Sequence, residues 1–207
     1  MFTDSGLPPL TSDPEPNVTP RQEELVDHAL ALVREAGLPG LTVRRLAERA
    51  GFTEAALYRH FASKQELLKA LMGALGERLL VPVRRIAAEV DRPAAERLKA
   101  ILHHHVKIVL DSAGLPILIV AEAVASRDEA MLARIRITLS EYLGILEDLL
   151  DELPGRAHRP VPRTLGLLML GVPAASALRL RVLPDAELEA AARNELVDYL
   201  VDRLLAG

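Results

Sequence analysis

The chain has 207 residues, of which half are apolar and only 3% aromatic, and its net charge is −4 at pH 7. This composition favours an all-α protein that is long enough to form a small and a larger domain. The absence of cysteine excludes disulfide bonds, thiol catalysis and cysteine-ligated zinc.

The first 18 residues are predicted to form a disordered, proline-rich arm. They contain four prolines among Ser, Thr, Asp and Asn, and they lack Lys and Arg. Such a segment cannot build a packed core, and without cations we expect no DNA contact from it. The first helix should begin at Thr19-Pro20, where a capping box coincides with proline at the first helical position, and end at Gly37.

The stretch Leu41–Phe61 predicts two short helices joined by a tight turn. Thr42 suits the N-cap of the first helix, and Gly51 suits its left-handed C-terminus. Thr53 suits the N-cap of the second helix, which we expect at Glu54–Phe61. A short helix packed across another through a glycine turn is the helix-turn-helix arrangement, whose second helix can enter the major groove of DNA.

Further helices are expected downstream, and no stretch has clear strand alternation. Capping boxes at Ser63–Glu66 and Ser126–Glu129 mark the starts of two of them. The expected helices cover approximately residues 63–90, 94–111, 117–125, 126–153, 163–180 and 185–206.

The charge of the chain is unevenly distributed. Residues 1–20 hold three acidic residues and no basic one, whereas residues 21–70 hold eight Lys or Arg against seven acids, a net of +1. The remainder has a net charge of −2. The only positive segment is therefore the one that contains the predicted helix-turn-helix, which supports a contact with DNA there.

Three motifs follow one another in this segment: LTVRRLAERAGF, ALYRHF and SKQELL. In this order and spacing, residues 19–71 resemble the N-terminal domain of the TetR family of bacterial transcription regulators. Phe52 stands where the family more often has valine, and it keeps the position apolar. The resemblance implies a three-helix helix-turn-helix DNA-binding domain at residues 19–71. It also implies a C-terminal helical bundle at residues 72–207 that binds an effector and dimerises.

The resemblance further implies which side chains would contact a palindromic operator of double-stranded DNA. Backbone phosphates would be contacted by Thr42, Tyr58, His60 and Lys64, with Arg44 or Arg45 assisting. Base edges would face Thr53, Glu54, Ala55 and Arg59.

Chemistry supports several of these contacts. Arg59 can donate two hydrogen bonds to guanine, and Ala55 can touch a thymine methyl group. Glu54 can accept from cytosine, or it can serve only as a favourable charge at a helix N-terminus. For Tyr58 we favour a DNA contact over a half-buried packing role.

The C-terminal part would hold the effector. His105 falls on the apolar face of its expected helix, while His103 and His104 turn away from it. His105 and Glu122 are candidate polar anchors in an apolar cavity, although a core histidine satisfied by a neighbour is the simpler alternative. Three consecutive histidines on a helix cannot converge on one ion, so we predict no metal site and no cofactor.

The last two expected helices carry broad apolar stripes, and Gly166 and Gly171 allow close helix approach. The family's dimer is built from its last two helices packed against those of the partner. We therefore favour a homodimer through these helices over an ordinary core within one chain, because a two-fold pair doubles the DNA site.

These observations predict a homodimeric repressor that leaves its operator when a small, lipophilic effector binds. The lack of Phe and Trp after Phe61 favours an aliphatic ligand over a planar one. The run EAALYRHF also resembles a nucleoid-occlusion factor of the same fold, so a DNA-binding protein that acts through a protein partner is the alternative. We find no phosphate loop, nucleophile elbow or zinc-protease motif, and expect no enzyme activity.

The N-terminus carries no basic region followed by an apolar one, and no apolar run approaches the length of a membrane span. We therefore expect a cytoplasmic protein with no membrane contact.

Overall fold

The computed structural model describes residues 20–58, 61, 63–153, 164–182 and 195–206. The described part is built from helices, with a short 3₁₀ turn at Leu38–Gly40 and no strand. In chain order the helices are α1 (Pro20–Ala36), α2 (Val43–Ala50), α3 (Glu54–Tyr58), α4 (Lys64–Ala87), α5 (Ala94–Asp111), α6 (Leu115–Ser126), α7 (Glu129–Asp151), α8 (Thr164–Val182) and α10 (Leu196–Ala206). The all-α prediction is confirmed.

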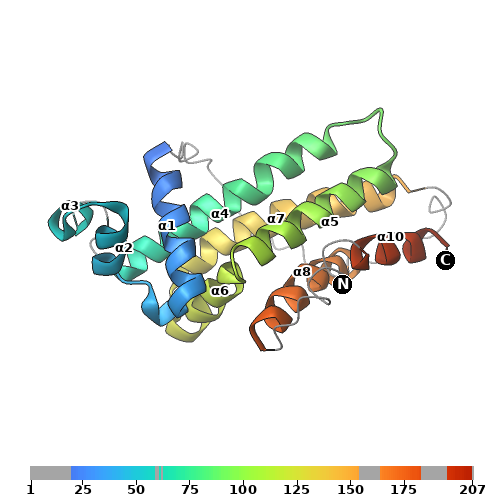
Figure 1. Ribbon diagram of the computed structural model, residues 1–207. Coiled ribbons are helices and arrows are strands. Elements are labelled where there is room, and N and C mark those ends of the chain that lie inside the picture. The colour runs from blue at the N-terminus through green and yellow to red at the C-terminus, as the bar shows by residue number, and fades with distance from the viewer. Residues whose placement is uncertain (1–19, 59–60, 62, 154–163, 183–194, 207) are drawn as a thin grey trace, which may run out of the picture.

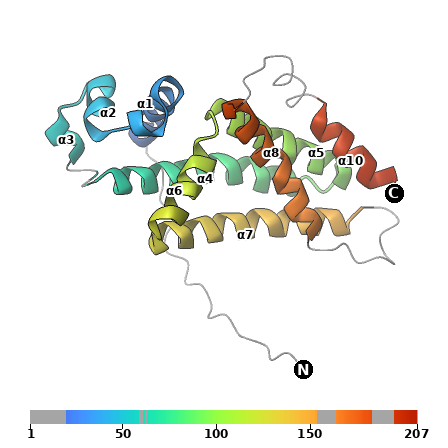
Figure 2. The ribbon, with the colours of Figure 1, turned by 90° about the horizontal axis from the view of Figure 1, so that it is seen from below.

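Helices α1 to α3 gather at one end of the molecule, and α4 runs from this end into the body (Figure 1). Helix α5 is the centre of the body, because it packs against α4, α7, α8 and α10. Figure 2 shows α4 and α7 running alongside each other, with α6 crossing between them near the N-terminal helices.

The expected caps form at three helix starts. The hydroxyl of Thr42 accepts from the Arg45 amide at 3.2 Å, and that of Ser63 accepts from the Glu66 amide at 3.2 Å. Thr53 makes the same contact with the Ala56 amide at 3.1 Å. These bonds satisfy amides that have no partner inside the helix.

The expected start of α7 is wrong. Asp128, not Ser126, caps this helix, and its carboxylate accepts from the Met131 amide at 3.0 Å. Ser126 is the last residue of α6, and its hydroxyl donates to the Glu122 carbonyl. A left-handed residue, Arg127, separates the two helices (φ 54°).

Other boundaries shift by a few residues. Helix α6 begins at Leu115 because Gly114 adopts a left-handed conformation (φ 70°) and Pro116 fits the first turn. Helix α4 ends at Ala87 instead of near residue 90. The described part of α3 ends at Tyr58, and the expected arm 1–18 lies outside the described residues.

The core forms two clusters. The first joins α1, α2 and the start of α4 to α6 and the start of α7, through residues such as Leu46, Leu71, Leu115 and Ile119. The second joins the rest of α4 and α7 to α5, α8 and α10. The expected domain boundary at residues 71/72 falls inside α4, which contributes to both clusters, so it stays a prediction.

Within the described residues, no single helix is long and apolar enough to cross a membrane. Only α5 and α6 taken together reach that length and composition, and they meet at a bend of 76°.

Candidate nucleic-acid interface and interior cavity

Helices α2 and α3 bury one side and expose the other. Gly51, in a left-handed conformation (φ 70°), turns the chain between them. Leu46, Ala47 and Leu57 are buried in the first core cluster. The residues expected at base edges lie on the opposite side: Thr53, Glu54 and Ala55 are all exposed. This surface is free to enter a groove of DNA.

Tyr58 lies at the end of α3 and is 50% exposed, so it is not a core residue. This exposure leaves its hydroxyl free for a phosphate, as the DNA interpretation requires. Arg59 and His60, the other two candidates of this segment, lie outside the described residues.

The arginines near the start of α2 already have partners. The Arg44 guanidinium donates to the Glu48 carboxylate at 3.0 Å, and this bond, together with the charges of Glu48 and Glu54, raises the pKa of Arg44. Arg45 donates to the Gly40 carbonyl at 3.2 Å. Both side chains remain exposed, and a phosphate would compete with these contacts.

Two contacts tie the helix-turn-helix to its neighbours. Arg49 forms an ion pair with Glu35 of α1 at 2.7 Å. Lys64, the first residue of α4, donates from Nζ to the Leu38 carbonyl at 3.3 Å. Because an ammonium group has three N–H donors, Lys64 can hold this carbonyl and still reach a phosphate.

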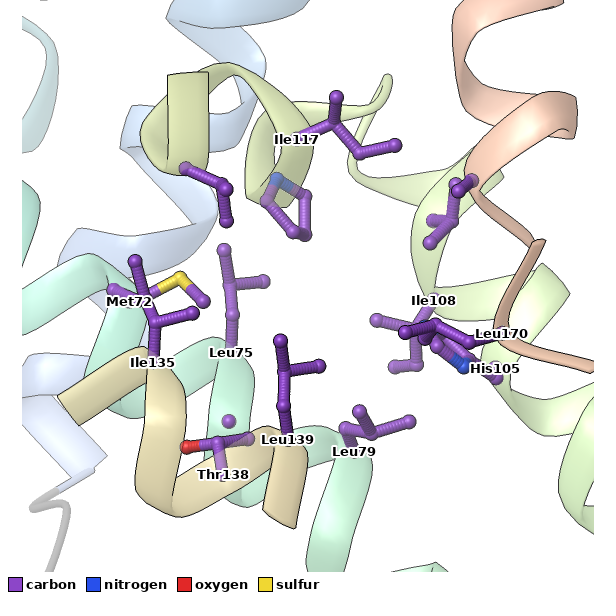
Figure 3. Close-up of a pocket in the computed structure, with 15 residues that line it drawn as sticks. Met72, Leu75, Leu79, His105, Ile108, Ile117, Ile135, Thr138, Leu139 and Leu170 are labelled. Atoms are coloured by element: carbon purple, nitrogen blue, oxygen red, sulfur yellow. The ribbon is translucent and has the colours of Figure 1, made fainter. Parts of the chain in front are cut away.

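A cavity of about 310 Å³ lies in the body between α4, α5, α6, α7 and α8 (Figure 3). Its wall is almost entirely aliphatic. The lining residues are Met72, Leu75, Gly76, Leu79, His105, Ile108, Val109, Pro116, Ile117, Val120, Ile135, Thr138, Leu139, Leu170 and Ala174.

Of these residues, only His105 was expected from the sequence. The others come from five helices, and only packing brings them together. One local signal existed: Gly76 interrupts the buried face of α4, and a Cβ there would lie 3.4 Å from the Thr138 hydroxyl.

The three consecutive histidines of α5 face three different neighbours. His103 Nε2 lies 3.1 Å from a carboxylate oxygen of Asp198 on α10, and His104 Nε2 lies 2.9 Å from the Arg78 carbonyl on α4. His105 turns inward to the cavity and to Tyr142 of α7, with the two rings edge to face and their centroids 4.8 Å apart. A rotation of about 100° per residue explains this divergence, which prevents the three imidazoles from sharing one ion.

His105 is 8% exposed, and its Nδ1 has no hydrogen-bond partner. Burial first, and then the neighbouring His104, lower the pKa of His105 to about 3. The imidazole is therefore uncharged at neutral pH. This arrangement differs from a core histidine satisfied by a neighbour, which was the simpler interpretation.

The placement expected for Glu122 is wrong. This residue is exposed on α6 and does not line the cavity. Helix α6 buries Leu115, Ile119 and Ala123, which repeat every four residues, and Glu122 precedes Ala123 on the outer side.

Helices α8 and α10 present apolar side chains to solvent. These exposed residues are Leu167, Leu168, Leu178, Val182, Leu196 and Tyr199, each at least 42% exposed. On α8 they follow a helical spacing of three and four residues, together with the exposed Gly171 and Ala175. Exposed apolar residues at such a spacing are typical of a protein–protein interface.

Sequence comparison identifies the N-terminal part. The family described as "Bacterial regulatory proteins, tetR family" matches residues 25–71. The HTH-type transcriptional repressor KstR2 of Mycobacterium tuberculosis is 37% identical over 101 residues, which cover 45% of this chain and 50% of KstR2. This part of the chain belongs to the TetR family.

A second similarity extends further along the chain. The nucleoid occlusion factor SlmA of Vibrio campbellii is 29% identical over 158 residues, covering 74% of this chain and 80% of SlmA. The aligned part of the chain spans only about half the length of KstR2.

Solved structures extend the likeness of fold to about nine tenths of the chain. A TetR transcription regulator from Haloarcula marismortui aligns with a TM-score of 0.70 at 20% identity, covering 90% of this chain and 96% of the other. The ketosteroid transcriptional regulator KstR2 of Mycobacterium tuberculosis aligns with a TM-score of 0.66 at 22% identity, covering 92% and 96%.

Proposed function

We propose that this protein is a sequence-specific transcription repressor that binds a palindromic operator as a homodimer and leaves it when a small, lipophilic effector binds. The observation that carries this proposal is the position of α4. Its first residue, Lys64, contacts the turn before α2, and its residues Met72 to Leu79 line the cavity. One helix therefore adjoins both the DNA-binding end and the effector site.

DNA recognition follows from the exposed side of the helix-turn-helix. Thr53, Glu54 and Ala55 can face base edges, while Thr42, Tyr58, His60 and Lys64 position the protein on phosphates, with help from Arg44 or Arg45. Arg59 would read guanine. The similarity to the repressor KstR2 supports repression as the outcome.

The homodimer is supported by the exposed apolar face of α8 and α10. Two copies that pair these helices would bury the face and form a four-helix contact. The pair would also place two recognition helices on one side of DNA, one helical turn apart.

Release from the operator follows from the thermodynamic linkage between effector binding and DNA binding. An effector shifts the protein away from the DNA-competent state only to the extent that it binds the other state more tightly. Since the cavity wall includes four residues of α4, a displacement of α4 changes both the cavity and the position of the helix-turn-helix.

A second function, nucleoid occlusion through a protein partner, is favoured by the similarity to SlmA. The two functions differ in what they require of the body. An effector-responsive repressor needs an interior cavity, whereas the alternative needs an exposed surface for its partner. The aliphatic cavity supports the repressor.

The test is selection of genomic fragments by the purified, ligand-free protein at near-physiological salt, followed by sequencing. We expect one or a few palindromes with half-sites about 10 base pairs apart, close to genes that the protein regulates. Many sites spread along the chromosome would favour nucleoid occlusion. A lack of any enrichment would contradict DNA binding by this chain.

A further inference from the structure

The chemistry of the cavity wall restricts what can occupy it. Among the described residues that line it, only His105 and Thr138 carry polar side-chain atoms, and none carries a charge at neutral pH. In Figure 3, Thr138 and His105 lie apart, with the side chains of Leu139 and Leu79 drawn between them. A carboxylate or ammonium group would lose its water here and find no opposite charge, which is strongly unfavourable.

The two polar groups are not equivalent. The Nδ1 atom of His105 is buried without a partner, whereas Thr138 has no unpaired buried atom. A threonine in a helix can also donate its hydroxyl to a carbonyl of the preceding turn. His105 is therefore the group in the wall that gains most from a new hydrogen bond.

The orientation of His105 is set by its surroundings. Tyr142, which is fully buried, packs its ring edge to face against the imidazole. Burial keeps the imidazole neutral, with a pKa of about 3. A neutral imidazole has one nitrogen that donates and one that accepts, so a hydroxyl can pair with Nδ1 in either tautomer and a carbonyl can pair when Nδ1 carries the proton.

We propose that the cavity binds an uncharged, mainly aliphatic molecule whose hydroxyl or carbonyl oxygen forms its main hydrogen bond with Nδ1 of His105. This inference rests on the proposed effector-responsive function and names the chemical class of the effector. Acids, amines and phosphorylated molecules of similar length should bind more weakly, because the wall offers their charged groups no opposite charge.

Four probes of equal chain length test the chemical class of the ligand: octan-1-ol, octan-2-one, octanoate and octylammonium. Their binding to the full-length protein at pH 7.5 is measured by isothermal titration calorimetry without DNA. We expect the alcohol or the ketone to bind at least about tenfold more tightly than either ion. Equal or tighter binding of an ion, or no binding of either neutral probe at millimolar concentration, would overturn the proposal.

Two variants test the role of His105 in ligand binding. His105→Phe keeps a ring against Tyr142 and should weaken octan-1-ol binding by about tenfold, the value of one hydrogen bond. Thr138→Val, which removes the other polar group at similar volume, should change the affinity by less than about twofold. Equal effects of the two variants would contradict the assignment to His105.

A spectroscopic measurement keeps the test valid if His105→Phe fails to fold. In ¹⁵N-histidine-labelled wild-type protein, octan-1-ol should shift the Nδ1 resonance of one neutral histidine, and unchanged resonances would refute the contact. These experiments are independent of DNA. If the protein binds its operator but none of the probes, only this inference fails. If a neutral probe binds but does not release the protein from its operator, only the release step of the proposed function fails.

Discussion

Two buried side chains of the body, His105 and Tyr142, leave polar atoms without partners among the described residues. An unpaired buried polar atom destabilises a fold by roughly 1–3 kcal/mol. Burial also raises the pKa of Tyr142 above its usual range, so its hydroxyl stays protonated. Of the two, only His105 lines the cavity, where a ligand can supply the missing contact.

The buried imidazole predicts a pH-dependent stability. The pKa of His105 falls from 6.5 to about 3 on folding, so below pH 6.5 the unfolded chain takes up a proton that the folded chain does not. The stabilising contribution is complete above pH 6.5 and is lost as the pH falls toward 3. Between pH 7 and 5 the free energy of unfolding should decrease by about 2 kcal/mol on account of His105.

Urea unfolding of wild type and His105→Leu at pH 7 and pH 5 checks this prediction. The groups facing His105 are the neighbouring His104 and Tyr142. The pKa of Glu141, lowered by a hydrogen bond from Arg84, affects stability only at lower pH. His105→Leu should remove most of the decrease, and the control His28→Leu, at a part-exposed histidine of α1, should retain it. An unchanged slope in His105→Leu would contradict the burial of a neutral imidazole.

A second residue-scale prediction separates recognition from positioning on DNA. Arg59→Ala should cost about 1–3 kcal/mol at one base position and relax sequence preference there. Lys64→Ala should weaken binding to all sequences and reduce the salt dependence of binding by about one phosphate contact. Selection from randomised operators at two salt concentrations measures both effects. Uniform loss in both variants would refute this division of roles.

At the scale of single elements, α2 carries an internal ion pair on its exposed side. Glu48 holds Arg44 at 3.0 Å and also places a negative charge on the surface that is proposed to meet phosphates. Exposed pairs of this kind contribute little to stability. We therefore expect the acid to moderate DNA affinity more than it stabilises the helix.

Glu48→Gln should raise operator affinity several-fold and steepen its salt dependence by up to about one phosphate contact, because Arg44 is released. Glu129→Gln is the matched control, since it removes the same charge from an exposed pair with Arg136 on α7. Fluorescence anisotropy over a salt series measures the effect. An equal rise in both variants would mean that only net charge matters.

The turn between α1 and α2 depends on a close approach at Gly40. A Cβ at this position would lie 2.3 Å from the Cβ of Ala36 and 2.9 Å from a guanidinium nitrogen of Arg45. Gly40→Ala should therefore lower the free energy of unfolding by about 1–3 kcal/mol. Gly144→Ala on α7 meets no atom within 4 Å and should raise it by up to about 1 kcal/mol. Chemical denaturation measures both, and destabilisation of the two by equal amounts would contradict the steric explanation.

At the scale of the whole molecule, α4 belongs to both core clusters and so connects the two ends. The first cluster also includes Leu115 and Ile119 of α6, so the DNA-binding end rests on the body through more than one helix. Bistable packing between such clusters is a physical route by which a small change in a cavity becomes a displacement of an end.

The exposed apolar residues of α8 and α10 predict that these helices form the dimer interface. Leu178→Glu, at a residue that is 62% exposed, should weaken the dimer by about thirtyfold or more and lower operator affinity with it. Val90→Glu, at an even more exposed residue beyond α4, should leave the dimer unchanged. Light scattering across a dilution series measures the assembly. A wild-type monomer, or an unaffected Leu178→Glu dimer, would refute this interface.

Local sequence patterns were sufficient to predict much of the secondary structure. The helical class, the caps at Thr42, Thr53 and Ser63, and the turn at Gly51 depend on interactions within a few residues, and all are confirmed. The inward direction of His105 followed from helical periodicity in the same way. Ser126 was misassigned because two candidate caps lay two residues apart, and only the left-handed Arg127 decides between them.

The sequence by itself therefore determined the helices and the helix-turn-helix, because short-range hydrogen bonds and periodicity specify them, and its motifs carried the resemblance to the TetR family. Tertiary structure alone decided which helices surround the cavity, that Glu122 faces solvent, and that Nδ1 of His105 lacks a partner. These properties depend on how helices distant in the chain pack together, and packing is settled by the shapes of all the side chains at once.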